Sequence, residues 1–125
     1  MQQKLSDKIL NHLKHGKTSH GKVGCKVRPT EGEENSAWIS IVAKKGFDTR
    51  TELIQEVIIC YEIEYLELNK DYDEEDDAFD FDLFLVKQEL YYNLKDISQL
   101  ERVLHKWVDD FSLIEPLSNI SHPRI

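Results

Sequence analysis

The chain reads Tyr-Glu-Ile-Glu-Tyr over residues 61–65, Asp-Tyr-Asp-Glu-Glu-Asp-Asp over residues 71–77 and Phe-Asp-Phe-Asp-Leu over residues 79–83. The first and third stretches alternate apolar and acidic side chains, which is the two-residue period of a half-buried strand. We therefore predict an antiparallel strand pair joined by a long acidic loop.

Pairing these two strands would sort their side chains onto two faces. The apolar face would hold Tyr61, Ile63, Tyr65, Phe79, Phe81 and Leu83, and the opposite face would hold Glu62, Glu64, Asp80 and Asp82. Like charges that face each other across a strand pair repel, so stability alone does not explain the acidic face.

The residues before this stretch predict a helix and a hairpin. Residues 3–15 carry apolar side chains at helical spacing, and Gly16 is a typical helix stop. Residues 22–28 and 37–44 have strand composition, and the polar residues 30–36 between them have turn composition.

Residues 49–68 allow two interpretations. Thr49-Arg50-Thr51-Glu52 reads as a capping box, and the preferred prediction is a short helix that turns into a strand near Val57. The alternative is one long helix as far as Leu68, with an apolar stripe along one side. The β-branched and aromatic residues of this segment favour the strand, and Ile59 and Ile63 would lie opposite the stripe.

The C-terminal part predicts a strand, a helix and a tail. After a loop over residues 69–78, the strand is expected over residues 79–92. The helix is expected to be capped by Asp96 or Ser98, with Ser98 and Glu101 forming a capping box. Its apolar stripe comprises Leu100, Val103, Leu104, Trp107, Val108 and Phe111.

The order of these elements predicts the fold class. We expect an α+β fold, a four-stranded, mostly antiparallel sheet with the N- and C-terminal helices packed on one face. Residues 1–125 should form a single compact domain, complete in itself, with residues 116–125 as a surface tail. No signal peptide or membrane span appears, so a cytoplasmic location is expected. Cys25 and Cys60 are too few for a disulfide framework and should be buried small hydrophobes.

The net charge of −8 is unevenly distributed along the chain. Residues 1–50 hold ten Lys and Arg against five Asp and Glu, whereas residues 51–82 hold one Lys against thirteen Asp and Glu. Concentrated acidity is a surface property that repels nucleic acid, whose binding requires a basic footprint. Direct nucleic-acid binding is therefore disfavoured.

No catalytic or metal motif appears in the chain. Asp71, Asp73, Glu75 and Asp82 have the spacing of calcium ligands, but Asp76 stands where that loop requires glycine. The spacing of the cluster His12, His15, His20 and Cys25 matches no zinc signature. Nucleophile elbows, phosphate loops and dinucleotide fingerprints are missing. We expect no enzymatic activity, cofactor or metal.

Aromatic side chains lie among the acidic residues of positions 61–82. These aromatic side chains favour a binding surface over a simple solubilising loop. Tyrosines supply desolvated anchors, and clustered carboxylates steer a cationic partner. The predicted partner-binding residues are Glu62, Glu64, Asp71, Tyr72, Asp73, Glu74, Glu75, Asp76, Asp77, Asp80 and Asp82. The plain alternative is a charged loop that keeps a sheet edge from aggregating.

In size, compactness and acidity the chain is similar to the small immunity proteins that bacteria make against their own nuclease toxins. This class-level resemblance implies a binding protein that neutralises a basic toxin, expected to be a nuclease, by occluding its active cleft. A non-catalytic regulatory or assembly module with a solubilising acidic loop is the second hypothesis, and a small enzyme is the third.

Overall fold

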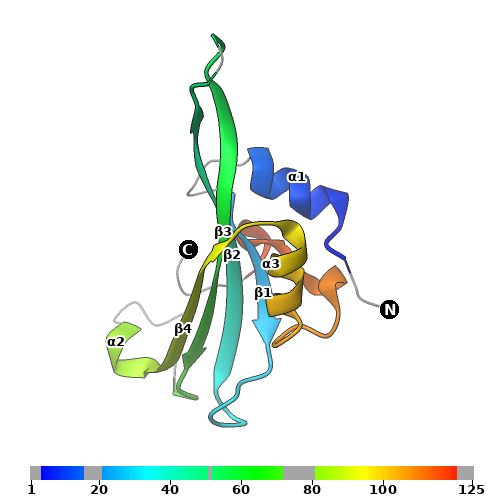
Figure 1. Ribbon diagram of the computed structural model, residues 1–125. Coiled ribbons are helices and arrows are strands. Elements are labelled where there is room, and N and C mark those ends of the chain that lie inside the picture. The colour runs from blue at the N-terminus through cyan, green and yellow to red at the C-terminus, as the bar shows by residue number, and fades with distance from the viewer. Residues whose placement is uncertain (1–3, 16–20, 51, 72–80, 121–125) are drawn as a thin grey trace.

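The computed structural model describes residues 4–15, 21–50, 52–71 and 81–120 and shows one antiparallel sheet with helices (Figure 1). Its five strands have the order β4-β3-β2-β1-β5. They are β1 Val23–Val27, β2 Ser36–Asp48, β3 Gln55–Leu68, β4 Leu85–Leu94 and β5 Glu115–Pro116. The helices are α1 Asp7–His15, α2 Phe81–Phe84 and α3 Ile97–Leu104, with 3-10 turns η1 Phe111–Leu113 and η2 Leu117–Asn119. The predicted α+β class is confirmed, with a fifth, two-residue strand beyond the predicted four.

Helices α1 and α3 share one hydrophobic core with alternate residues of the sheet, as the sequence predicted. The sheet contributes odd-numbered residues, among them Val23, Cys25, Ala37, Ile39, Ile41, Ile63 and Tyr65. The helices contribute Ile9 and Leu13 from α1 and Leu100 and Leu104 from α3. No described helix is long and apolar enough to cross a membrane.

The predicted helix after Thr49 is wrong, because β2 and β3 continue as a long hairpin as far as the Asp48–Gln55 pair. Leu53 and Ile54 are 72% and 70% exposed, so a helix here would have had no core to cover its apolar stripe. A β-bulge opposite Lys44 and Lys45 shifts the register. This bulge explains why residues 57–63 fit no single period.

The predicted pairing of residues 61–65 with residues 79–83 is also wrong. Residues 81–84 form one helical turn, α2, and strand β4 begins only at Leu85. Strand β3 therefore pairs further along β4, with Ile63 opposite Tyr91 and Glu64 opposite Leu90. Phe79 lies outside the described residues. The two strands are neighbours as predicted, but in a different register.

Helix α3 is shorter than its sequence stripe predicted. Asp96, one of the two predicted caps, accepts a hydrogen bond from the Gln99 N–H at 2.8 Å. The Ser98–Glu101 capping box is wrong, because the Glu101 carboxylate instead accepts from the Leu5 N–H at 2.6 Å. The helix ends at Leu104, yet Val108 and Phe111 remain buried.

Within the predicted tail, residue 116 belongs to strand β5, whereas Ser118 and Asn119 are exposed. Residues 115 and 116 form β5 beside β1. Leu117 is buried, and its N–H donates to the Lys22 carbonyl oxygen at 3.1 Å. Residues 121–125 lie outside the described residues.

Gly24 lies in β1, close to both β2 and the C-terminal segment. A β-carbon there would overlap the carbonyl oxygen of Ile39 and lie 3.0 Å from Leu117 Cδ2. Because this oxygen belongs to the backbone of the sheet, it cannot move aside without disturbing the strand pairing. We expect Gly24→Ala to lower the free energy of unfolding by about 1–3 kcal/mol in urea titrations. The exposed neighbour variant Lys26→Ala should stay within about 0.5 kcal/mol of the parent; equal stability of the two variants would contradict the expected overlap.

Candidate functional site

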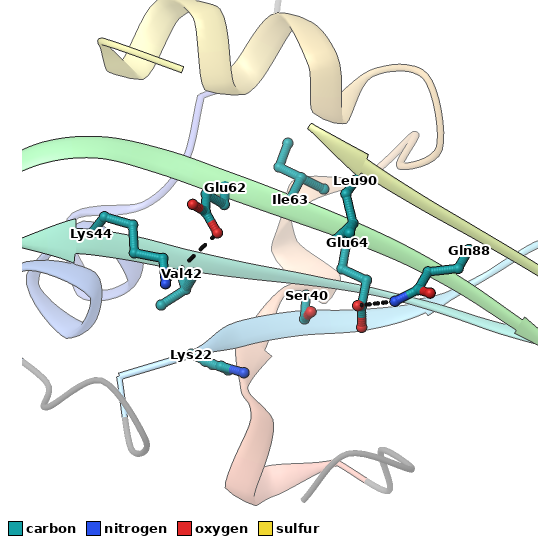
Figure 2. A pocket seen from close by; sticks show the side chains of 9 residues that line it. All are labelled: Lys22, Ser40, Val42, Lys44, Glu62, Ile63, Glu64, Gln88 and Leu90. Atoms are coloured by element: carbon teal, nitrogen blue, oxygen red, sulfur yellow. Dashed lines mark hydrogen bonds and ion pairs between the residues drawn. The ribbon is translucent and has the colours of Figure 1, made fainter. Parts of the chain in front are cut away.

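The candidate site lies on the open face, which we define as the face of the sheet opposite α1 and α3. At one end of this face Trp38, Leu66 and Leu68 form a small second core under Phe84 and Leu85. Toward its centre lies a cavity of about 340 Å³ (Figure 2). Its lining residues come from β2, β3, β4 and the residue before β1, and they are Lys22, Ser40, Val42, Lys44, Glu62, Ile63, Glu64, Gln88 and Leu90.

Glu62 and Glu64 both line this cavity, in agreement with their predicted place opposite Tyr61, Ile63 and Tyr65. Lys44 Nζ lies 3.9 Å from Glu62 Oε2. Gln88 Nε2 donates to Glu64 Oε2 at 2.8 Å (Figure 2). The repulsion expected on this face is therefore offset, because the neighbouring strands supply a cation and an amide donor.

Of the other predicted partner-binding residues, Asp71 alone has a described side chain, and Asp71 does not line this cavity. Asp71 is exposed just after the end of β3. Asp82 belongs to α2, and its side chain is not among those described. Outside the described residues lie Tyr72, Asp73, Glu74, Glu75, Asp76, Asp77 and Asp80.

Sequence reasoning missed Lys22, Lys44 and Ser40, which line the same cavity. The Ser40 side chain belongs to a residue that is only 8% exposed, and its hydroxyl makes no hydrogen bond to another described residue. The register places Ser40 between Gly24 and Glu64. That neighbourhood depends on pairing between distant segments, so no local pattern identifies it.

A second polar cluster, also missed, surrounds Glu67, which is fully buried. Its carboxylate accepts hydrogen bonds from Tyr65 Oη at 2.5 Å, Asn35 Nδ2 at 2.7 Å, and the backbone N–H groups of Thr30 at 2.9 Å and Glu31 at 3.2 Å. Burial alone raises the pKa of Glu67, but the hydrogen bonds outweigh it and lower the pKa to about 2. Glu67 is thus an ionised anchor that ties the β1–β2 loop to β3. A carboxylate with its lone pairs occupied in this way is suited to structure rather than to proton transfer.

The cysteines and histidines show no reactive arrangement within the described ranges. Cys25 and Cys60 are free and buried, as predicted. Burial raises the pKa of the Cys25 thiol to about 11, so it stays protonated at neutral pH and is a poor nucleophile. Among the described residues, no group of three or more His, Cys, Asp or Glu side chains could hold a metal ion. His20 lies outside the described residues. So do residues 72–80, which include most of the stretch with calcium-ligand spacing.

The chain matches no protein-family profile, and no curated protein or solved structure is significantly similar to it.

Proposed function

We propose that the protein is a non-catalytic, acidic protein-binding module of the immunity or antitoxin type. It would neutralise a basic, nuclease-like partner by occluding the partner's active cleft. The observation that supports this most is the charge of residues 51–82, thirteen acids against one Lys, with Glu62 and Glu64 on the open face of the sheet. A nuclease cleft is basic because it binds phosphates, so an acidic surface complements it.

Exposed apolar side chains beside these acids support a protein partner. Leu90 lines the cavity and is 43% exposed, and Tyr92, two residues further along β4, is 54% exposed. Interfaces combine aromatic and aliphatic anchors with a charged rim, and tyrosine is enriched among the residues that dominate binding. The open face offers both parts of this arrangement.

The β2–β3 hairpin supports the second hypothesis, a regulatory or assembly module. Figure 1 shows this hairpin projecting beyond the rest of the sheet. Near its end Phe47, Leu53 and Ile54 are 69–72% exposed. Exposed apolar side chains gathered on one projection are typical of a docking element.

Neutralising the acidic surface should slow association with a basic partner. The partner to test is the product of the reading frame next to this chain's gene, immobilised and measured at low and raised salt. We expect Asp73→Asn/Glu74→Gln/Asp76→Asn/Asp77→Asn, and separately Glu62→Gln/Glu64→Gln, to lower the on-rate at low salt by about tenfold. The effect should fade as salt rises, because the Debye length is only about 10 Å at 0.1 M.

A matched control removes two acids outside residues 51–82, with Asp7→Asn/Glu33→Gln. It should keep the parent on-rate, and co-expression of the control should still protect cells from the partner. Full rate and affinity of the quadruple variant at low salt would contradict the acidic interface. Loss of binding only in Leu53→Ser/Ile54→Ser would favour the assembly module instead.

A further inference from the structure

Strand β4 lies at one end of the sheet, where β3 is its only neighbour among the described strands (Figure 1). Residues 87–91 pair with β3 in one unbroken register, so this part of the strand is regular. Val86, Leu90 and Tyr92, all on this strand, are 41–54% exposed. An edge strand presents a row of backbone donors and acceptors that another chain can pair with. Strand β4 thus offers a surface for an added strand.

Two charged residues of β4 restrict which strand could be added. Lys87 Nζ lies 3.0 Å from Glu89 Oε1, and the two side chains are still 30% and 26% exposed. Lys87 also pairs with Glu31 at 2.8 Å, and Glu89 pairs with Lys106 at 3.1 Å. These four side chains form a neutral group of two cations and two anions. Charges at an edge discourage unrelated strands, because like charges opposite each other are destabilising.

The sequence Val86-Lys87-Gln88-Glu89-Leu90 is self-complementary about its centre. If two copies pair antiparallel with Gln88 opposite Gln88, Lys87 of each copy faces Glu89 of the other, and Val86 faces Leu90. A pairing centred on Lys87 or on Glu89 would instead set two like charges opposite each other. A pairing centred between residues would set Lys87 opposite Leu90 or Glu89 opposite Val86. Of these registers, the one centred on Gln88 alone matches opposite charges and apolar side chains together.

We propose that β4 pairs with β4 of a second copy of this chain, antiparallel and centred on Gln88, so that the two sheets become one. No present ion pair has to break, because Lys87 and Glu89 each gain a second partner beside the first. Residues opposite each other share a face, so the open faces of both copies lie on the same side. This inference goes beyond the proposed function and does not depend on it. Because five paired residues make a small interface, we expect a Kd of about 10–100 µM.

Analytical ultracentrifugation of the full chain from about 5 to 500 µM tests this pairing. We expect a reversible monomer–dimer equilibrium, and dilution of ¹⁵N-labelled protein should shift the backbone amide signals of residues 86–90. Lys87→Glu and Glu89→Lys should each weaken dimerisation by at least about tenfold, because like charges then meet across the edge. An equimolar mixture of the two variants should form a heterodimer at least about tenfold more tightly than either variant alone dimerises. In the mixture every contact between positions 87 and 89 across the edge joins opposite charges.

Matched controls separate the edge pairing from a general effect of charge. Lys95→Glu and Glu115→Lys make the same changes of net charge at exposed residues outside the paired stretch, and both should dimerise as the parent does. Val86→Arg leaves positions 87 and 89 intact but sets a cation opposite Leu90, so it should also weaken the dimer. The mixture stays decisive even where a single variant is less stable, because only pairing across the edge explains recovery in the mixture.

The proposal is overturned if the parent chain stays monomeric up to about 500 µM, or if the mixture of Lys87→Glu and Glu89→Lys stays monomeric. It is equally overturned if a dimer survives both single changes but is lost in Ile54→Ser, which would place the contact on the projecting hairpin. None of these outcomes bears on binding of a basic protein, which the on-rate measurements test separately.

Discussion

Replacing Glu67 by glutamine is expected to lower the free energy of unfolding by about 3 kcal/mol at pH 7. The fold lowers the pKa of this fully buried carboxyl from 4.5 to about 2. A shift of that size corresponds to about 3 kcal/mol of preference for the charged form. Glutamine keeps the volume but presents an NH₂ group, which cannot accept from Thr30, Glu31 or Asn35. Urea titration measures the loss.

The same anchor predicts a defined dependence on pH. Because the folded-state pKa of Glu67 is lower than its unfolded-state value, the stabilisation is complete above about pH 4.5 and is lost as the pH falls toward about 2. The stability difference between the parent and Glu67→Gln should therefore shrink over this interval. Other carboxylates titrate equally in both proteins and cancel in the difference.

A control distinguishes the buried anchor from an ordinary acid. Glu62→Gln, on the open face of the same strand, should cost at most about 1 kcal/mol, because its carboxylate is partly exposed and its ion pair with Lys44 spans 3.9 Å. A Glu67→Gln penalty that stayed constant from pH 7 to pH 2 would mean that the lost contacts do not depend on the carboxylate charge.

Within residues 61–65, local alternation was sufficient to predict which side chains face the core, whereas Leu83, predicted on the same apolar face, is 77% exposed. Tyr61, Ile63 and Tyr65 point to the helices and Glu62 and Glu64 to the open face, because a strand repeats every two residues wherever it is regular. The projecting hairpin could not be predicted in this way. The bulge in β3 opposite Lys44 and Lys45 breaks the two-residue period of the strand. The residues before the bulge have the sequence pattern of a short capped helix.

The surroundings of the two buried polar residues, Glu67 and Ser40, depend on distant segments of the chain. Apart from the hydrogen bond from Tyr65, Glu67 accepts its hydrogen bonds from residues 30, 31 and 35 of the β1–β2 loop, more than thirty residues away. One local signal was present: Glu67 is in phase with Ile63 and Tyr65 rather than with Glu62 and Glu64, which predicts a carboxylate on the core side. No local signal of this kind exists for Ser40, because its lack of a described hydrogen-bond partner follows only from how the strands pair in the folded sheet.

Trp107→Ala is expected to lower the free energy of unfolding by about 3–5 kcal/mol. Trp107 follows α3 and packs against side chains of β3 and β4. Its ring stacks on the buried Tyr65 at 5.5 Å with an interplanar angle of 14°, and it meets Tyr91 edge-on at 5.4 Å and 73°. Lys106 Nζ lies 5.1 Å from its ring centroid. Because the side chain is half-buried and not fully enclosed, we expect a value near the lower limit.

The matched control is Tyr92→Ala, an aromatic truncation on β4 at a side chain that is 54% exposed, which should cost less than about 1 kcal/mol. Thermal and urea unfolding of both variants measure the difference.

The stacking on Tyr65 ties the segment after α3 to the same part of β3 that Glu67 connects to the β1–β2 loop. Loss of the indole should therefore also weaken the Glu67 anchor. A Trp107→Ala penalty below about 1 kcal/mol would show that the indole contributes little to folding. The segment after α3, rather than the open face, would then become the better candidate for the partner surface.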